Sequence, residues 1–280
     1  MSETTLTGRE TAPLVRIMLV LTGGAAGFIG LILFLGSSIT DDNFAWPLTS
    51  PVTSVILGAG FVGAVPLLWW SATKILWEQL RVCMAASTIL TVLLSAITLA
   101  DLGHTSASGG DLVPYLLALA WVIGVTLLAL GNLLALVVQF REPALPLPRT
   151  APIPRWAVAL VSLEGSGLLI VGGALLIEPN FWRGLLPWQV GAFDARMLGA
   201  WGVTLGVTLL IALIEDDLLR VKPGLLGAAG IGALGLVGLA WRSADITWGN
   251  WASTLTVVLI GGLFATGAIG WRLARVPTKV

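Results

Sequence analysis

The chain has 280 residues, of which 56% are hydrophobic and only 11% are charged, and its mean hydropathy is +0.94. Soluble domains are about half apolar and about a quarter charged, so this composition excludes an ordinary soluble protein and predicts an all-α integral membrane protein. The net charge of zero favours no nucleic-acid partner, and the single cysteine, Cys83, excludes an intrachain disulfide and a cysteine metal cluster.

Eight apolar segments are long enough to cross a bilayer, which needs about 20 residues at about 1.5 Å each. They are interrupted by charged residues, proline and glycine. The expected spans are Leu14–Leu35, Val52–Thr73, Val82–Ala100, Pro114–Val138, Trp156–Ile177, Met197–Ile214, Leu225–Trp241 and Trp251–Trp271.

The basic residues outside these spans, together with Arg16 at the start of the first span, are distributed unevenly between the two sides of the membrane. Twelve fall on one side: Arg9, Arg16, Lys74, Arg81, Arg141, Arg149, Arg155, Arg220, Lys222, Arg272, Arg275 and Lys279. Only Arg183, Arg196 and Arg242 fall on the other. Because cytoplasmic loops carry the excess of Lys and Arg, this pattern predicts a multi-pass protein of the cell membrane with cytoplasmic N- and C-termini.

Tryptophans are expected at both membrane boundaries, where their amphipathic rings form belts. The outer belt would comprise Trp46, Trp182, Trp188, Trp241, Trp248 and Trp251, and the inner belt Trp69, Trp70, Trp77, Trp156 and Trp271. Trp121 and Trp201 lie deeper in their spans. They are the best candidates for the alternative role, an aromatic ligand site.

The chain is expected to consist of two similar halves. Residues 141–155 contain five prolines and three arginines, which favours an extended cytoplasmic linker between a four-helix repeat at 1–140 and another at 156–280. A shift of 141 positions places Leu57-Gly58-Ala59 on Leu198-Gly199-Ala200. Four spans per half give both copies the same orientation, so we expect an eight-helix transmembrane bundle from two parallel four-helix repeats.

Two short windows around these matching segments resemble a repeated motif of bacterial multipass membrane proteins, a W-P-W-x-L-T loop followed by a helix that opens L-G-A-W. Here the windows read Trp46-Pro47-Leu48-Thr49 with Leu57-Gly58-Ala59, and Leu186-Pro187-Trp188 with Leu198-Gly199-Ala200-Trp201. The resemblance implies a multi-pass membrane protein and brings no activity with it.

Glu164 is the only ionisable side chain well inside an expected span, and intramembrane acids mark functional sites by default. Asn132 and Thr208 fall at comparable depth, so we expect these three residues to form a polar site between the halves. Glu164 would serve either as a proton or cation site or as a neutral side chain that joins helices through hydrogen bonds.

The remaining polar residues favour structural roles. The acidic run at 215–217 is interpreted as a solvated loop, with divalent-cation binding as the weaker alternative, and Arg196 beside Asp194 as a local ion pair rather than an anion site. The sole histidine, His104, is expected at the surface and excludes bis-histidine haem ligation within one chain. No nucleotide, metalloprotease or hydrolase motif occurs, so we expect no enzyme activity, no cofactor and no metal.

These observations predict a structural or accessory membrane protein that packs with lipids and with other membrane-protein subunits. The alternative is a transporter of small solutes or ions, proton-coupled, that uses the interface between the two repeats. The duplication, Glu164 and Pro66 inside the second span motivate this alternative.

Overall fold

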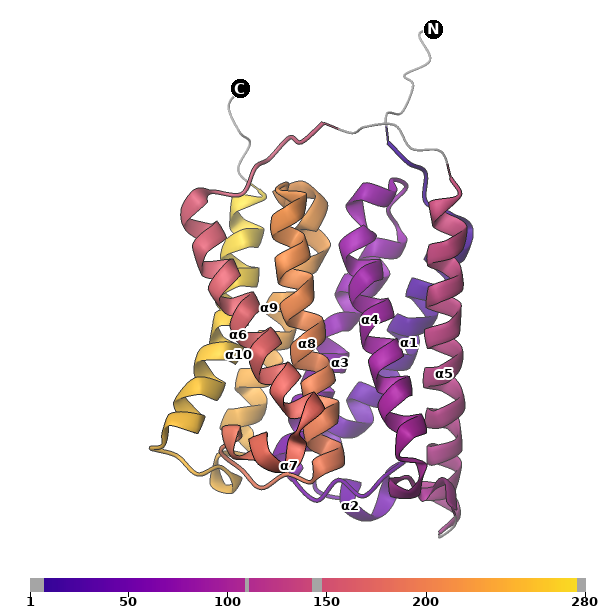
Figure 1. The fold of residues 1–280 in the computed structure, drawn as a ribbon, viewed down its shortest axis with the longest axis vertical. Helices are drawn as coiled ribbons and strands as arrows, with labels where there is room; N and C mark the ends of the chain where they lie inside the picture. The colour runs from indigo at the N-terminus through magenta and orange to yellow at the C-terminus, as the bar shows by residue number, and fades with distance from the viewer. Residues whose placement is uncertain (1–7, 109–110, 143–147, 276–280) are drawn as a thin grey trace, which may run out of the picture.

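The computed structural model describes residues 8–108, 111–142 and 148–275, and this part of the chain is helical without a β-strand (Figure 1). Eight of its helices are long and apolar enough to cross a membrane. They are α1 (Pro13–Leu35), α3 (Pro51–Ala72), α4 (Arg81–Ala100), α5 (Leu112–Phe140), α6 (Arg155–Ile177), α8 (Ala192–Glu215), α9 (Leu218–Trp241) and α10 (Trp251–Leu273). The prediction of an all-α, multi-pass membrane protein is confirmed at this level. Residues 143–147 of the predicted linker and both chain ends lie outside the described residues.

Two helices begin earlier than their expected spans. Helix α8 begins at Ala192 instead of Met197, and α9 begins at Leu218 instead of Leu225. The carboxylate of Asp217 caps α9, because its Oδ1 accepts a hydrogen bond of 2.9 Å from the amide of Leu219. Charged residues that find partners therefore extend these helices beyond their apolar segments.

The eight helices form one bundle in which the two halves of the chain lie side by side (Figure 1). Within the halves, α1 packs along α3, α6 along α8, α4 along α5 and α9 along α10. Across the halves, α3 packs along α9 and α4 along α8, and α3 contacts α9 far more extensively than it contacts α4. The core therefore lies between the halves. Helix α5 ends and α6 begins at one end of the bundle, called here the linker end; the other is the far end.

Glycines allow two pairs of helices to approach closely. A Cβ on Gly58 of α3 would lie 2.9 Å from the carbonyl oxygen of Gly30 on α1. A Cβ on Gly199 of α8 would lie 2.7 Å from the carbonyl oxygen of Gly172 on α6. Small residues of this kind bring helix backbones together in membranes, where lipid supplies no hydrophobic driving force. The α1–α3 and α6–α8 contacts are thus built in the same way.

Two hydrogen bonds at the linker end are also built alike. The Trp77 amide donates to the carbonyl oxygen of Arg9 at 2.8 Å, and the Leu218 amide donates to that of Ala151 at 2.7 Å. In each half, the segment before the first long helix is thereby joined to the chain at or just before the start of the third.

Two tryptophans expected in the outer belt are instead buried at the far end, where each reaches across to the other half. The indole Nε1 of Trp46 donates to Oδ1 of Asp194 at 3.0 Å, and that of Trp188 donates to Oγ1 of Thr53 at 2.9 Å. Trp77, expected in the inner belt, is buried as well. The belt interpretation is wrong for these three residues, because each ring packs inside the protein rather than against lipid.

The acidic run at residues 215–217, where α8 ends, is an ion-pair network rather than a solvated loop. Glu215 lies buried between Arg81 of α4 and Arg220 of α9. Asp217 is buried too, and it accepts hydrogen bonds from the amide and the hydroxyl of Thr150. The expectation of a solvated loop is wrong for both acids, because basic and polar groups distant in sequence surround them.

Candidate functional site

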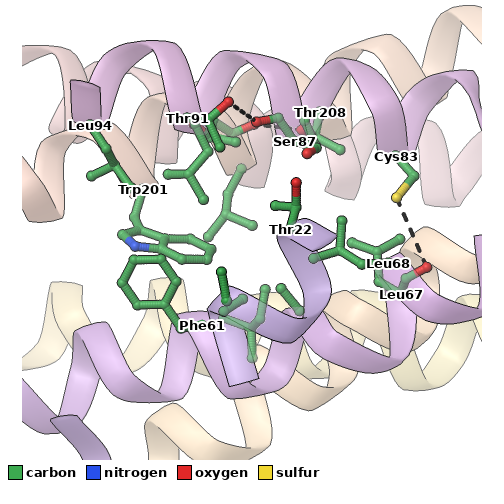
Figure 2. Close-up of a pocket in the computed structure, with 18 of the residues that line it drawn as sticks. Thr22, Phe61, Leu67, Leu68, Cys83, Ser87, Thr91, Leu94, Trp201 and Thr208 are labelled. Atoms are coloured by element: carbon green, nitrogen blue, oxygen red, sulfur yellow. Dashed lines mark hydrogen bonds between the residues drawn. The ribbon is translucent and has the colours of Figure 1, made fainter. Parts of the chain in front are cut away.

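A cavity of about 270 Å³ lies in the middle of the bundle (Figure 2). Its walls come from α1, α3, α4 and α5 of the first half, from α8 and α9 of the second, and from Leu263 of α10. Apolar atoms form almost all of the surface. The volume lies just below the range of roughly 300–1,000 Å³ that small-molecule sites occupy.

Aromatic side chains form one end of the central cavity. The ring of Phe61 meets the ring of Trp201 edge to face, with centroids 5.1 Å apart, and the ring of Trp121 at 6.2 Å. Trp46 packs behind Trp121 at 5.1 Å. Trp121 and Trp201 are the two tryptophans that the sequence places too deep for a belt, and both line this cavity.

Hydroxyl groups line the middle of the cavity, and Figure 2 shows Thr22, Ser87, Thr91 and Thr208 there. Thr91 donates a hydrogen bond to the carbonyl oxygen of Ser87 at 2.8 Å, and Thr208 donates to that of Thr204 at 2.6 Å. The hydroxyl hydrogens of Thr91 and Thr208 are thus used in hydrogen bonds within their own helices, and the oxygens can still accept hydrogen bonds.

Two buried polar atoms of the cavity wall have no hydrogen-bond partner among the described residues. They are Oγ1 of Thr22 and the indole Nε1 of Trp201. A buried donor or acceptor without a partner costs about 1–3 kcal/mol. Two residues of the cavity wall thus carry an unpaired polar atom, an indole N–H and a hydroxyl, and both atoms are enclosed within the wall.

The central cavity reaches the outer surface of the bundle between α1 and α5. Phe28 of α1 lines it with 62% of its own surface exposed, and Ala120 of α5 lines it and is exposed as well. Gly124, on the same side of α5, has no atom within 4 Å of the place where a Cβ would stand. The lining residues on this side, Phe28, Ala120 and Gly124, are apolar side chains and a glycine.

A smaller cavity of about 130 Å³ lies beside the first, among α3, α6, α8, α9 and α10. Trp201 and Leu263 line both cavities, and Trp188 closes the smaller one near the far end. Its walls are also almost entirely apolar.

The three residues of the predicted polar site are divided between two places. Thr208 lines the central cavity. Asn132 of α5 is fully buried behind it, and its Nδ2 donates to the hydroxyls of Ser87 and Thr91, both in the cavity wall, at 3.1 and 3.2 Å. These contacts join Asn132 to the hydroxyl-lined part of the cavity. These contacts were not predicted, because the depth of a residue in its span does not show which neighbouring helix its side chain contacts.

Glu164 lies apart from the other two and lines neither cavity. Its carboxyl rests against Gly262 of α10, where a Cβ would collide with it. The side chain is 9% exposed, and its Oε1 has no hydrogen-bond partner in the described part of the chain. A glycine on the neighbouring helix thus provides the space for this acid.

Charged residues at the far end form a small network that contacts the ring of Phe193. His104 pairs with Asp101 at 3.0 Å and stacks parallel to the ring of Phe193, and Arg196 approaches Asp101 at 4.0 Å. The Arg196 guanidinium therefore meets Asp101 rather than the neighbouring Asp194, which bonds to Trp46. Within the described residues, no three His, Cys, Asp or Glu side chains gather as metal ligands.

The central cavity is the feature of this fold best suited to hold a molecule, since it combines volume, apolar walls and unpaired polar atoms. Comparison of the chain with protein-family models, with curated proteins and with solved structures gives no match.

Proposed function

We propose that this protein is an accessory membrane protein that binds, in its central cavity, a largely apolar molecule dissolved in the bilayer. The molecule would carry at least one oxygen that accepts a hydrogen bond. The observation that supports this most directly is the pairing of an apolar cavity of about 270 Å³ with the unpaired indole N–H of Trp201.

The apolar walls favour a lipid-like occupant over water or an ion. A buried water needs two to four polar partners, and apolar cavities stay dry while accepting apolar molecules. A bare ion is disfavoured because no charged side chain lines the cavity. The opening between α1 and α5 would give a molecule access from the hydrocarbon layer without passage through water.

The unpaired polar atoms favour an oxygen on the occupant. A pure hydrocarbon would leave Nε1 of Trp201 and Oγ1 of Thr22 without partners, whereas a carbonyl, ester or ether oxygen could accept from either of them. Sites that present a hydrogen-bonding group discriminate against analogues that lack its partner. We therefore expect the protein to prefer an oxygen-bearing chain to an alkane of equal length.

The proposal is tested by photolabelling the purified protein in lipid nanodiscs with a photoactivatable long-chain methyl ester. Labelled peptides should map to α4 and α8, and the unlabelled ester should compete better than the alkane of the same length. Trp201→Phe should reduce that preference about three- to tenfold, which is the effect of one neutral hydrogen bond.

Matched glycine substitutions separate cavity binding from labelling at the protein surface. Gly224 lines the cavity and Gly24 lies on the outer face of α1, and neither has an atom within 4 Å of a Cβ position. Gly224→Leu should fill the cavity and abolish the competable labelling, whereas Gly24→Leu should leave it unchanged. Equal labelling of the two variants, or equal competition by ester and alkane, would overturn the proposal.

We also propose that residues 1–140 and 156–280 are parallel copies of one four-helix unit, related by an axis along the membrane normal. Three reciprocal features support this: the glycine contacts of α1–α3 and α6–α8, the bonds of Trp77 and Leu218, and the indole bonds across the halves. The acceptors of the two indoles, Thr53 and Asp194, are 141 positions apart, the same shift that aligns the sequences.

A carrier role is the second candidate, and one observation favours it. The central cavity lies where α4 of one half meets α8 of the other, which is the place at which alternating access between halves would act. Glu164 faces α10 instead, so a carrier of this kind would not need its carboxyl to bind the solute. Proteoliposome flux that survives Glu164→Gln but not Gly224→Leu would favour the carrier, and absence of flux for the photolabelling ligand would exclude it for that ligand.

A further inference from the structure

Three basic side chains from three segments of the chain gather on a pair of tryptophans at the linker end. The rings of Trp70 and Trp271, near the ends of α3 and α10, meet at 5.2 Å. The Lys74 ammonium lies 4.7 Å from the Trp70 ring, and the Lys222 ammonium lies 5.2 Å from the Trp271 ring. The Arg275 guanidinium also lies over the Trp271 ring, at 5.0 Å. These five residues are called here the basic cluster.

No described carboxylate balances the cations of the basic cluster, in contrast to Arg81, Arg149 and Arg220 at the same end. Arg81 and Arg220 both contact Glu215, and Arg149 contacts Asp216. No ion pair within 4.0 Å connects the three cations of the cluster to any acid among the described residues. Cation–π contacts of this kind contribute only about 0.5–1 kcal/mol each at exposed sites and leave the positive charges unneutralised.

We propose that the basic cluster binds the phosphate group of an anionic phospholipid. Like charges held together on one surface attract an anion, and phosphate oxygens accept several charge-assisted hydrogen bonds from Lys and Arg at once. The proposal concerns a surface site at the helix ends and is independent of the central cavity.

The position of the cluster favours a lipid headgroup over a free anion. Trp70 and Trp271 stand in the last turns of helices long enough to span the membrane, and indole rings of this type sit at the level of the headgroups. Lys74 and Lys222 are half-buried, so their aliphatic stems can lie along apolar surface while the ammonium groups reach the phosphate layer. The excess of basic residues predicts that this end faces the cytoplasm, where anionic lipids attract such groups.

The test measures retention of phosphatidylglycerol and of phosphatidylcholine by native mass spectrometry of the whole protein released from nanodiscs of both lipids. The double variant Lys74→Gln/Lys222→Gln removes two charges from the cluster. The matched control, Arg141→Gln/Arg155→Gln, removes two charges from exposed positions at the same end that make no ion pair within the described structure.

The wild-type protein and the control should retain phosphatidylglycerol in preference to phosphatidylcholine. The cluster variant should lose this preference about tenfold or more, because each basic group near the surface contributes about fivefold to the attraction. Excess inorganic phosphate should not displace the lipid; displacement would show a free-anion site and overturn the lipid assignment. Equal losses in both double variants would show that general surface charge retains the lipid and would refute the site.

Gly224→Leu should leave the retention of phosphatidylglycerol unchanged. Failure of the lipid proposal is therefore distinguishable from failure of the cavity proposal.

Discussion

The two reciprocal indole bonds predict unequal losses of stability when each is removed. Trp46→Phe deletes the donor to the carboxylate of Asp194, which is buried at 3% exposure. Leaving a buried polar group without its partner costs about 1–3 kcal/mol, and the Asp194 side chain accepts no other hydrogen bond within the described residues. Trp188→Phe deletes a bond to the neutral hydroxyl of Thr53, which is worth about 0.5–1.5 kcal/mol. Both substitutions keep most of the aromatic packing. We therefore expect Trp46→Phe to lower the free energy of unfolding by roughly twice as much.

The free energies are measured by reversible unfolding in mixed micelles of mild detergent and dodecyl sulfate. Trp182→Phe is the control, since Trp182 lies at the same end of the bundle, is 41% exposed and makes no described hydrogen bond. It should change the free energy by less than about 0.5 kcal/mol. The reasoning is refuted if Trp46→Phe is as mild as this control, or if Trp188→Phe is the more destabilising of the two.

Three further predictions concern the bundle. Arg220→Met should lower the free energy of unfolding by about 3–5 kcal/mol in the same assay, because it leaves two buried carboxylates without a buried cation. Gly199→Ala should destabilise by about 1–3 kcal/mol, since its Cβ meets backbone at 2.7 Å, whereas Gly173→Ala, with open space, should stabilise by up to about 1 kcal/mol. In a variant without the native cysteine, a cysteine at Arg155 should react with a charged maleimide only in permeabilised cells and one at Trp182 in intact cells; the reverse pattern would invert the predicted orientation.

Hydropathy located all eight long helices, because every backbone polar group in lipid must be satisfied within a helix and each span needs a fixed length of apolar residues. Hydropathy did not locate the ends of α8 and α9, because charged residues there were interpreted as lying outside the helices. Glu215 lies inside its helix because Arg81, 134 positions earlier in the chain, neutralises it. A partner so distant in sequence is not visible in any local window.

The candidate site was predictable only in part. The depth of Trp121 and Trp201 in their spans already separated them from the membrane belts, and both line the cavity. The depth of Asn132 placed it among polar residues, but its partners on α4 depend on which faces of α4 and α5 meet. The cavity itself results from packing of several helices from both halves. Side-chain volumes along one helix do not determine whether such a space stays open.

The proposed duplication, combined with the packing, predicts how many molecules each chain holds. Helices α1 and α6 both have 23 residues. Aligned from their first residues, a shift of 142 instead of the 141 that aligns α3 with α8, they carry Thr22 and Glu164 at the tenth position, each followed by glycine. Both side chains are buried with an unpaired oxygen, but Thr22 faces the central cavity whereas Glu164 fills the space against Gly262. The cavity beside α6 and α10 has a volume of about 130 Å³, well below the roughly 300 Å³ from which small-molecule sites begin. Two copies of one fold would thus provide one site, and native mass spectrometry should find a single bound ester per chain. Two equivalent esters per chain would contradict this prediction and show that the second half also binds the ester.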